Sequence, residues 1–136
     1  MKSLLWTLAS VAIPTALAFA QATTVERAAK GRPDQDIQVG AYINVQADCT
    51  SGPLPTIRLA LPPAHGKVTV KRGKANATNY KQCLALEVPA YVAFYRSAPS
   101  FNGTDAMTLE VKYPGGRSEI QKITVTIGTG EPGQRI

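Results

Sequence analysis

His65 is the only histidine of the chain and the first residue to weigh as a catalytic group. A hydrolase triad would need a nucleophile in a strained turn beside the imidazole, and no G-x-S-x-G pattern occurs. Because His65 stands directly before Gly66, it fits a turn that opens a strand, where the ring can bond to backbone groups. One histidine also falls short of a histidine-based zinc site. We therefore expect a structural role for His65 and no enzyme activity.

Three aspartates are candidate calcium ligands. Asp34 and Asp36 form a D-x-D pattern, and Asp105 lies in a Phe-Asn-Gly-Thr-Asp turn. Calcium needs several oxygen ligands that converge on one point, and the spacing is not that of an EF-hand. Asp105 can instead cap its own turn through side-chain to backbone hydrogen bonds. The second interpretation is favoured, so we expect neither a metal nor a cofactor.

Positive charge is concentrated between residues 67 and 81. The chain holds 15 Lys and Arg against 9 Asp and Glu, a net charge of +6, which favours anionic partners. The candidate binding residues are Lys67, Lys71, Arg72, Lys74, Tyr80 and Lys81. Two interpretations stay open: a site for phosphate, sulfate or carboxylate groups, or a solvated strand edge whose lysines discourage pairing with other chains. Lys67 and Lys71 should share the outer face of one strand.

Two cysteines, Cys49 and Cys83, permit one intramolecular disulfide. Closing a loop of about 34 residues would stabilise the fold by roughly 3–4 kcal/mol in the chain-entropy model. Free thiols, intermolecular pairing or a metal site are the alternatives, and the absence of C-x-x-C spacing disfavours the last. Cys49 is in register with the apolar positions that precede it, so we expect it to point inward.

The first twenty residues have the three parts of a secretory signal peptide. Lys2 supplies positive charge, an apolar run follows, and Ala18-Phe19-Ala20 matches the small residues of a cleavage site before Gln21. An uncleaved membrane anchor is the alternative, but Pro14 interrupts the run. Export to the periplasm or beyond suits a disulfide and disfavours nucleic acid as a partner.

After this segment we expect a flexible lead-in over residues 21–35, with a short helix at 24–30 as an alternative, and a loose tail over 129–136. Between them, residues 36–128 alternate apolar and polar side chains with a period of two. The expected strands are 37–47, 56–61, 67–71, 84–88, 91–96, 107–111 and 123–127. Residues 72–81 read as a polar loop, and the glycine pair of 113–116 predicts a hairpin turn.

This pattern predicts an all-β, antiparallel sandwich of about seven strands. Within it, Ile57, Leu59 and Leu61 should share one face. Alternation places Phe94 inside and Tyr95 on the opposite face, and core packing is favoured over sugar stacking for these rings.

The segment from Leu61 to Val70, LPPAHGKVTV, resembles the "P-x-H-G-x-V-x-V" opening of bacterial cadherin-like and immunoglobulin-like tandem repeats. Tyr95 and the stretch 97–109, SAPSFNGTDAMTL, resemble the aromatic strand and "F-x-G-x-D" close of the same repeats. The resemblance covers about residues 55–127. It implies a sandwich of about seven strands used as a spacer or adhesive module, sometimes with calcium at domain junctions. This chain differs in having one unit, a cysteine pair and a longer basic loop.

Together these features predict an exported, disulfide-closed, immunoglobulin-like or cadherin-like sandwich that acts by binding. Its partner would be a protein or an anionic glycan of the cell envelope, not nucleic acid, with no stable membrane insertion once the signal segment is removed. The alternative is a periplasmic binding or inhibitor protein that recognises an anionic ligand through residues 67–81.

Overall fold

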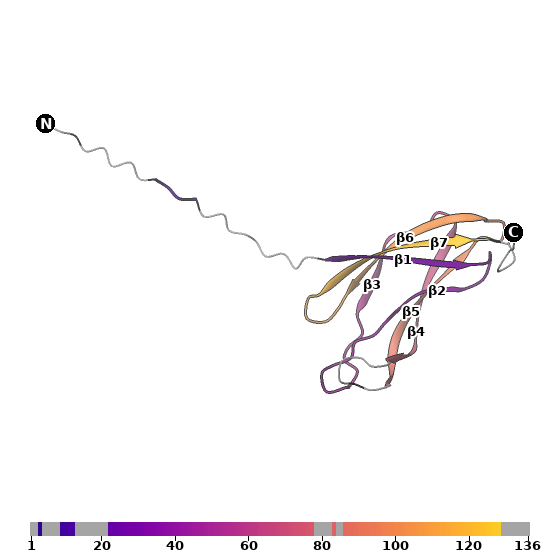
Figure 1. Ribbon diagram of the computed structural model, residues 1–136, viewed down its shortest axis with the longest axis horizontal. Helices are drawn as coiled ribbons and strands as arrows, with labels where there is room; N and C mark the ends of the chain where they lie inside the picture. The colour runs from indigo at the N-terminus through magenta and orange to yellow at the C-terminus, as the bar shows by residue number, and fades with distance from the viewer. Residues whose placement is uncertain (1–2, 4–8, 13–21, 78–82, 84–85, 129–136) are drawn as a thin grey trace, which may run out of the picture.

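The computed structural model describes residues 3, 9–12, 22–77, 83 and 86–128, and these form seven strands in two sheets. The strands are β1 (Thr23–Gly31), β2 (Ile37–Tyr42), β3 (Thr56–Leu61), β4 (Gly66–Ala77), β5 (Leu86–Ser97), β6 (Gly103–Lys112) and β7 (Ser118–Ile127). One sheet has the order β1-β7-β6-β3 and the other β2-β5-β4 (Figure 1). The described residues contain no helix that could span a bilayer. The all-β, two-layer architecture expected from the alternation is confirmed.

The core lies between the two sheets. In β6 and β7 every second residue is buried, and the fully buried side chains include Leu109, Ile123 and Val125. From the other sheet Tyr42 and Tyr95 meet them, with exposed fractions of 1% and 0%. Burial of aromatic and branched side chains from both layers is the main force that holds the sheets together.

The first strand contradicts the expected lead-in. Residues Thr23–Gly31 form neither a loose segment nor a helix, but a strand parallel to β7, from Thr23 beside Glu119 to Gly31 beside Ile127 (Figure 1). Most of its side chains are exposed, so the apolar alternation that identifies a half-buried strand is absent. Pairing of the backbone with β7 stabilises this edge strand, and that pairing leaves no signature in the side-chain pattern.

The second strand is shorter than expected and changes face. Its register shifts between Gln38 and Gly40, where β2 pairs with β5. A β-bulge adds one residue to one strand and so reverses the faces of the residues that follow. Ala41 is therefore exposed and Tyr42 buried, the reverse of the continuous alternation expected from residue 37 to residue 47.

A second bulge separates Leu61 from the other apolar residues of β3. Leu59 is opposite the buried Leu109 of β6, whereas Leu61 is opposite Thr108, which points to the other face. The expectation that Ile57, Leu59 and Leu61 share one face is wrong for Leu61. This side chain is 62% exposed on the outer face of the four-stranded sheet.

The hairpin of β4 and β5 is longer than expected. Residues 72–77 continue β4 instead of opening a loop, and 84–88 and 91–96 belong to one strand from Leu86 onward. The pairing runs without a bulge from Gly66 beside Ser97 to Ala77 beside Leu86. Residues 72–77 have polar and small side chains, few of which are buried, so the sequence shows no apolar alternation there. Their backbone nevertheless pairs with β5.

A small second cluster covers the far half of this hairpin. In β5 the buried residues are Ala93 and Tyr95 near its end, but Val88 and Ala90 near its start, so the buried face switches along the strand. Val88 packs with Val45, Ala77 and Cys83. The predicted disulfide between Cys49 and Cys83 joins this cluster, with Cα atoms 5.5 Å apart. Cys49 lies in a turn with φ 66° and not at the end of a strand, as had been expected.

Candidate functional site

The basic residues of β4 point to both faces of the strand. Because side chains alternate, Lys67 and Lys71 share one face, and Arg72 and Lys74 share the other. Lys67 and Lys71 are opposite Arg96 and Val92 on the outer face of the three-stranded sheet, so these two lysines do share a face as expected. The other two candidate binding residues, Tyr80 and Lys81, lie outside the described residues.

The outer face of the three-stranded sheet carries charges of both signs. Arg96 forms ion pairs with Asp36 at 2.9 Å and with Asp34 at 3.7 Å. Lys71 lies 3.9 Å from Asp36, and its ammonium is 5.5 Å from the ring centre of Phe94. The two D-x-D carboxylates thus neutralise part of the basic face. All these groups are well exposed, so each pair adds little stability.

Phe94 does not point inward as predicted, whereas Tyr95 packs in the core, as favoured for these rings. Tyr95 is fully buried beside Ala93, whereas Phe94 is partly exposed on the outer face under Lys71. Alternation correctly placed Tyr95 and Ala93 on the same face of β5. The error lay in placing Phe94 on the core face of the strand; the buried ring is Tyr95, whose hydroxyl has a buried partner, Asp105.

Two cations of the segment have no ion pair among the described residues. Lys74 pairs with Glu87 at 3.3 Å, but Lys67 and Arg72 make no such contact in that part of the chain. Arg72 is opposite Tyr91 in the β4–β5 ladder, on the same face as Val70. The charges available to an anionic group are therefore spread along β4 and over both of its faces, which suits an extended partner better than a compact anion.

One side of the sandwich is incompletely closed. The edge strands β3 and β4 face each other there across a cavity of about 290 Å³, which we call the β3–β4 groove. Its lining residues are Leu54, Pro55, Thr56, Ile57, Val70 and Tyr91. Leu59 belongs to the same inward face as Ile57, since their partners on β6 are both buried. Yet Leu59 is 40% exposed and Val70 39% exposed.

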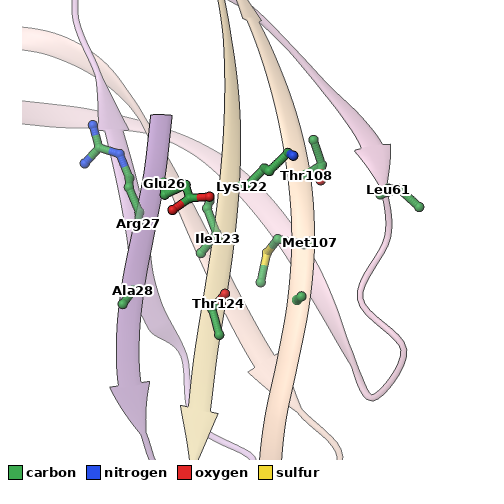
Figure 2. Close-up of a pocket in the computed structure, with 10 residues that line it drawn as sticks. Glu26, Arg27, Ala28, Leu61, Met107, Thr108, Lys122, Ile123 and Thr124 are labelled. Carbon is green, nitrogen blue, oxygen red and sulfur yellow. The ribbon is translucent and has the colours of Figure 1, made fainter. Parts of the chain in front are cut away.

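A shallow hollow of about 600 Å³ lies on the outer face of the other sheet. Figure 2 shows Glu26, Lys122, Thr108 and Leu61 in a row across the four strands, with Thr124 in the next row. Small side chains make the floor of this hollow, and charged ones its rim. Its lining combines apolar residues such as Leu61 and Ala28 with the charged Glu26, Arg27 and Lys122.

The outer face of the four-stranded sheet also carries an ion cluster. Arg58 donates to Glu110 at 2.6 Å, and Lys112 lies 3.3 Å from the same carboxylate. The hydrogen bond from Arg58 and the charge of Lys112 lower the pKa of Glu110.

Asp105 links the His65-Gly66 turn to the Phe-Asn-Gly-Thr-Asp turn. Its buried carboxylate accepts hydrogen bonds from the backbone N–H groups of Ala64 at 3.0 Å and His65 at 2.9 Å. It also accepts from the Tyr95 hydroxyl at 2.8 Å and from the N–H of Ala106 at 2.9 Å. One carboxylate therefore ties the turn before β4, the end of β5 and the start of β6. The cap predicted for Asp105 is present, and it reaches a second turn as well.

Electrostatics at this point favour the charged carboxylate. Burial alone would raise the pKa of Asp105, but the hydrogen bonds from Tyr95 and the three backbone groups outweigh it, so the pKa lies below its ordinary value. Burial, followed by the bond to Asp105, raises the pKa of Tyr95. All four donors hold the carboxylate in the fold, which makes Asp105 a structural group.

His65 lies in the bend directly before β4, where its position before Gly66 placed it. Its ring stacks on Phe101 with ring centres 4.3 Å apart and planes at 10°, and its carbonyl accepts from Ala98 N–H at 2.9 Å. Gly66 is required beside it, because a Cβ there would come within 2.5 Å of the carbonyl oxygen of Arg96. Within the described part of the chain, no three His, Cys, Asp or Glu side chains are grouped as metal ligands would be.

Comparison with known proteins assigns no family to the chain. No protein-family model matches the chain, and no curated protein or solved structure matches it either. The β3–β4 groove and the basic edge beside it are therefore the surfaces from which function must be argued. Sequence reasoning missed the groove, because alternation marks Leu59 and Val70 as buried and does not show that the sandwich is open beside them.

Proposed function

We propose that the chain is an exported, non-enzymatic interaction module of the bacterial envelope, built on an immunoglobulin-like sandwich. Strands β2, β5 and β4 share one sheet and β3, β6 and β7 the other, as strands B, E, D and C, F, G do in immunoglobulin domains. Here the first strand joins the sheet of the last. This division supports the fold that the P-x-H-G and F-x-G-x-D motifs imply.

The observation that carries the binding role is the exposure of inward-facing apolar side chains at the open side. Leu59 and Val70 sit on the core side of two different sheets and still expose 40% and 39% of their surface. Burying apolar surface stabilises an association by about 25 cal/mol per Å². A partner that covers the β3–β4 groove would complete a core that the chain leaves unfinished, which is why this surface is a better candidate than the polar faces.

Export is supported by two features. The N-terminal residues have the charge, apolar run and Ala-Phe-Ala site of a signal peptide. The Cys49–Cys83 disulfide fits an oxidising compartment, such as the periplasm or the cell surface. A cell-envelope protein is the partner class that follows from this location.

A second candidate function is the recognition of an anionic ligand by the basic segment. The exposed Lys67 and Arg72, which have no ion pair in the described part of the chain, favour it. Such binding would be weakened strongly by salt and would not depend on Val70.

The test begins with the full chain, exported by a bacterial host through its own N-terminal segment and purified from the envelope fraction. Covalent capture of neighbours in envelope extract is compared for the original chain, Leu59→Lys, Val70→Lys and the matched control Leu61→Lys. The control places the same charge at an apolar residue that is 62% exposed on the opposite sheet. A partner retained by Leu61→Lys and lost by both Leu59→Lys and Val70→Lys is expected, provided that all variants keep the original circular-dichroism spectrum. A partner lost equally from all three variants, or from none, would contradict the role of the groove.

A further inference from the structure

The free edge of β4 adds a second property to the open side. β4 spans twelve residues, the longest of the four strands that end a sheet in the described structure. It pairs with β5 along its whole length without a bulge, so its other edge is regular. A long, regular edge presents a row of unpaired backbone groups, on which an extended chain can form a further ladder.

The two faces of this edge differ in chemistry. On the outer face the exposed side chains of Lys67 and Lys71 flank Thr69. On the inner face Val68 and Val70 lead into the β3–β4 groove. A strand added at about 4.8 Å from β4 would alternate in the same way, with one set of side chains beside the lysines and the other set over Val70.

From this we infer that β4 receives an extended segment of a partner protein in which acidic and apolar side chains alternate, added as a fourth strand to the β2-β5-β4 sheet. This inference rests on the proposed function and names the partner's chemistry. Its acidic side chains would lie opposite Lys67 and Lys71, where opposite charges across a ladder are favourable. Its apolar side chains would cover Val70 and enter the groove.

Charge complementarity separates this occupant from a second copy of the chain. If two β4 strands paired antiparallel about Thr69, Lys67 of each would lie opposite Lys71 of the other. Like charges directly opposite one another destabilise a ladder. In this register the lysines disfavour self-pairing and favour an acidic strand, while Val68 and Val70 on the inner face favour apolar residues beside them.

The experiment uses a synthetic peptide of about six residues in which glutamate alternates with valine. This length matches residues 66–71 of β4, where the valines alternate with Lys67, Thr69 and Lys71. The control peptide has the same composition in shuffled order, so that glutamates fall on both faces. Binding to the purified full chain is measured by fluorescence anisotropy at low and high salt. Amide hydrogen exchange locates the site.

The alternating peptide is expected to bind at least about tenfold more tightly than the shuffled one, since only the former matches both faces. Amide groups of β4 should gain protection. Lys67→Glu with Lys71→Glu, and separately Val70→Lys, should each weaken binding by about tenfold or more. Two matched controls, Lys122→Glu and Leu61→Lys, alter exposed residues of the other sheet and should change it less than about twofold.

Equal binding of the two peptides would overturn the inference and indicate charge attraction alone. The inference would also fall if the alternating peptide did not bind, or if the amide groups that gain protection lay at the hollow beside Lys122 and not in β4. Self-association of the chain with protection of β4 would overturn it in favour of a second copy. These failures differ from failure of the proposed function. If an envelope partner depends on Val70 and Leu59 but is not displaced by the alternating peptide, the interaction role stands and the acidic-strand inference falls.

Discussion

The two ends of the β4–β5 hairpin are held by different chemistry. At the end where β5 finishes, the buried carboxylate of Asp105 accepts four hydrogen bonds and joins two turns to Tyr95. At the end where β5 begins, a covalent bond joins Cys49 to Cys83 across a small cluster that includes Val88. The first end borders the main core, and the second lies beyond it.

The two ends need different anchors because they bury different amounts of apolar surface. Near Asp105 the large buried side chains of the main core supply apolar contact, so the turns need only an anchor that fixes their direction. The cluster at the other end has four buried residues, among them Ala77 and Val45, too few to order its long connections by burial alone. A disulfide acts there by restricting the unfolded chain. The β3–β4 groove runs between these two ends, so both must hold for its lining to stay in place.

Removing the carboxylate should have the largest effect. Asp105→Ala leaves the hydroxyl of Tyr95 and three backbone N–H groups without this acceptor in a buried site. We expect the free energy of unfolding, measured by urea denaturation, to fall by about 3–5 kcal/mol. A loss below about 1 kcal/mol would show that the main core, and not the carboxylate, orders this end.

The isosteric variant Asp105→Asn separates charge from shape. Because the folded pKa of Asp105 is lowered, its contribution is fully present above the unfolded pKa of about 3.9 and is lost as the pH falls through the folded value. The original chain should therefore lose stability on acidification more steeply than Asp105→Asn. Parallel acid profiles of the two proteins would contradict the ionised state of this carboxylate.

Opening the disulfide should have the next largest effect. Cys49→Ala with Cys83→Ala removes a cross-link over a separation of 34 residues. The expected loss is about 3 kcal/mol, measured by urea denaturation. Hydrogen exchange should rise first in residues 43–55 and in the start of β5, while the residues around Asp105 keep their protection. Equal loosening at both ends would mean that the two anchors act as one unit.

A neutral hydrogen bond of the main core should matter less than the Asp105 carboxylate. The hydroxyl of Tyr42 donates to the side-chain oxygen of buried Gln121 at 2.5 Å, which ties β2 to β7. Tyr42→Phe leaves that oxygen unpaired, and we expect a loss of about 1–2 kcal/mol at neutral pH.

The alkaline profile of the same variant tests the burial of this hydroxyl. Burial raises the pKa of Tyr42 to about 12, while nearby Arg27 opposes the shift. A raised folded pKa gives stability that is complete below the unfolded pKa of about 10 and is lost as the pH rises through the folded value. The stability gap between the original chain and Tyr42→Phe should therefore shrink between pH 10 and about 12. A constant gap would contradict the burial of the hydroxyl.

The sequence predicted those parts of the fold in which burial and turn chemistry act locally. Alternation in β6 and β7 and the bounds of β3 agree with the structure. The hairpin at Gly115 and Gly116 is also confirmed, since both adopt positive φ angles, of 95° and 96°. In these segments each side chain's exposure follows from its own strand, so a single sequence contains the information.

The wrong predictions concern features that depend on pairing with a strand distant in the sequence. β1 pairs with β7 across 96 residues and buries little. The bulges at Gly40 and before Leu61 arise from pairing with β5 and β6. The count of seven strands was right through two opposite errors, since β1 was missed and β5 was divided. The groove likewise depends on how far β3 stands from β4, which no local pattern expresses.

The smallest effect that still distinguishes the two ends is expected at the stacked pair of His65 and Phe101. The rings lie 4.3 Å apart and cover the turn that Asp105 anchors. His65→Ala removes the stack but keeps the backbone N–H that bonds to the carboxylate, so we expect a loss of about 0.5–1.5 kcal/mol in urea denaturation. His65→Phe retains a flat ring and should lose less. If His65→Ala costs as much as Asp105→Ala, the ring and not the carboxylate anchors this turn, and the contrast between an ionic and a covalent end no longer holds.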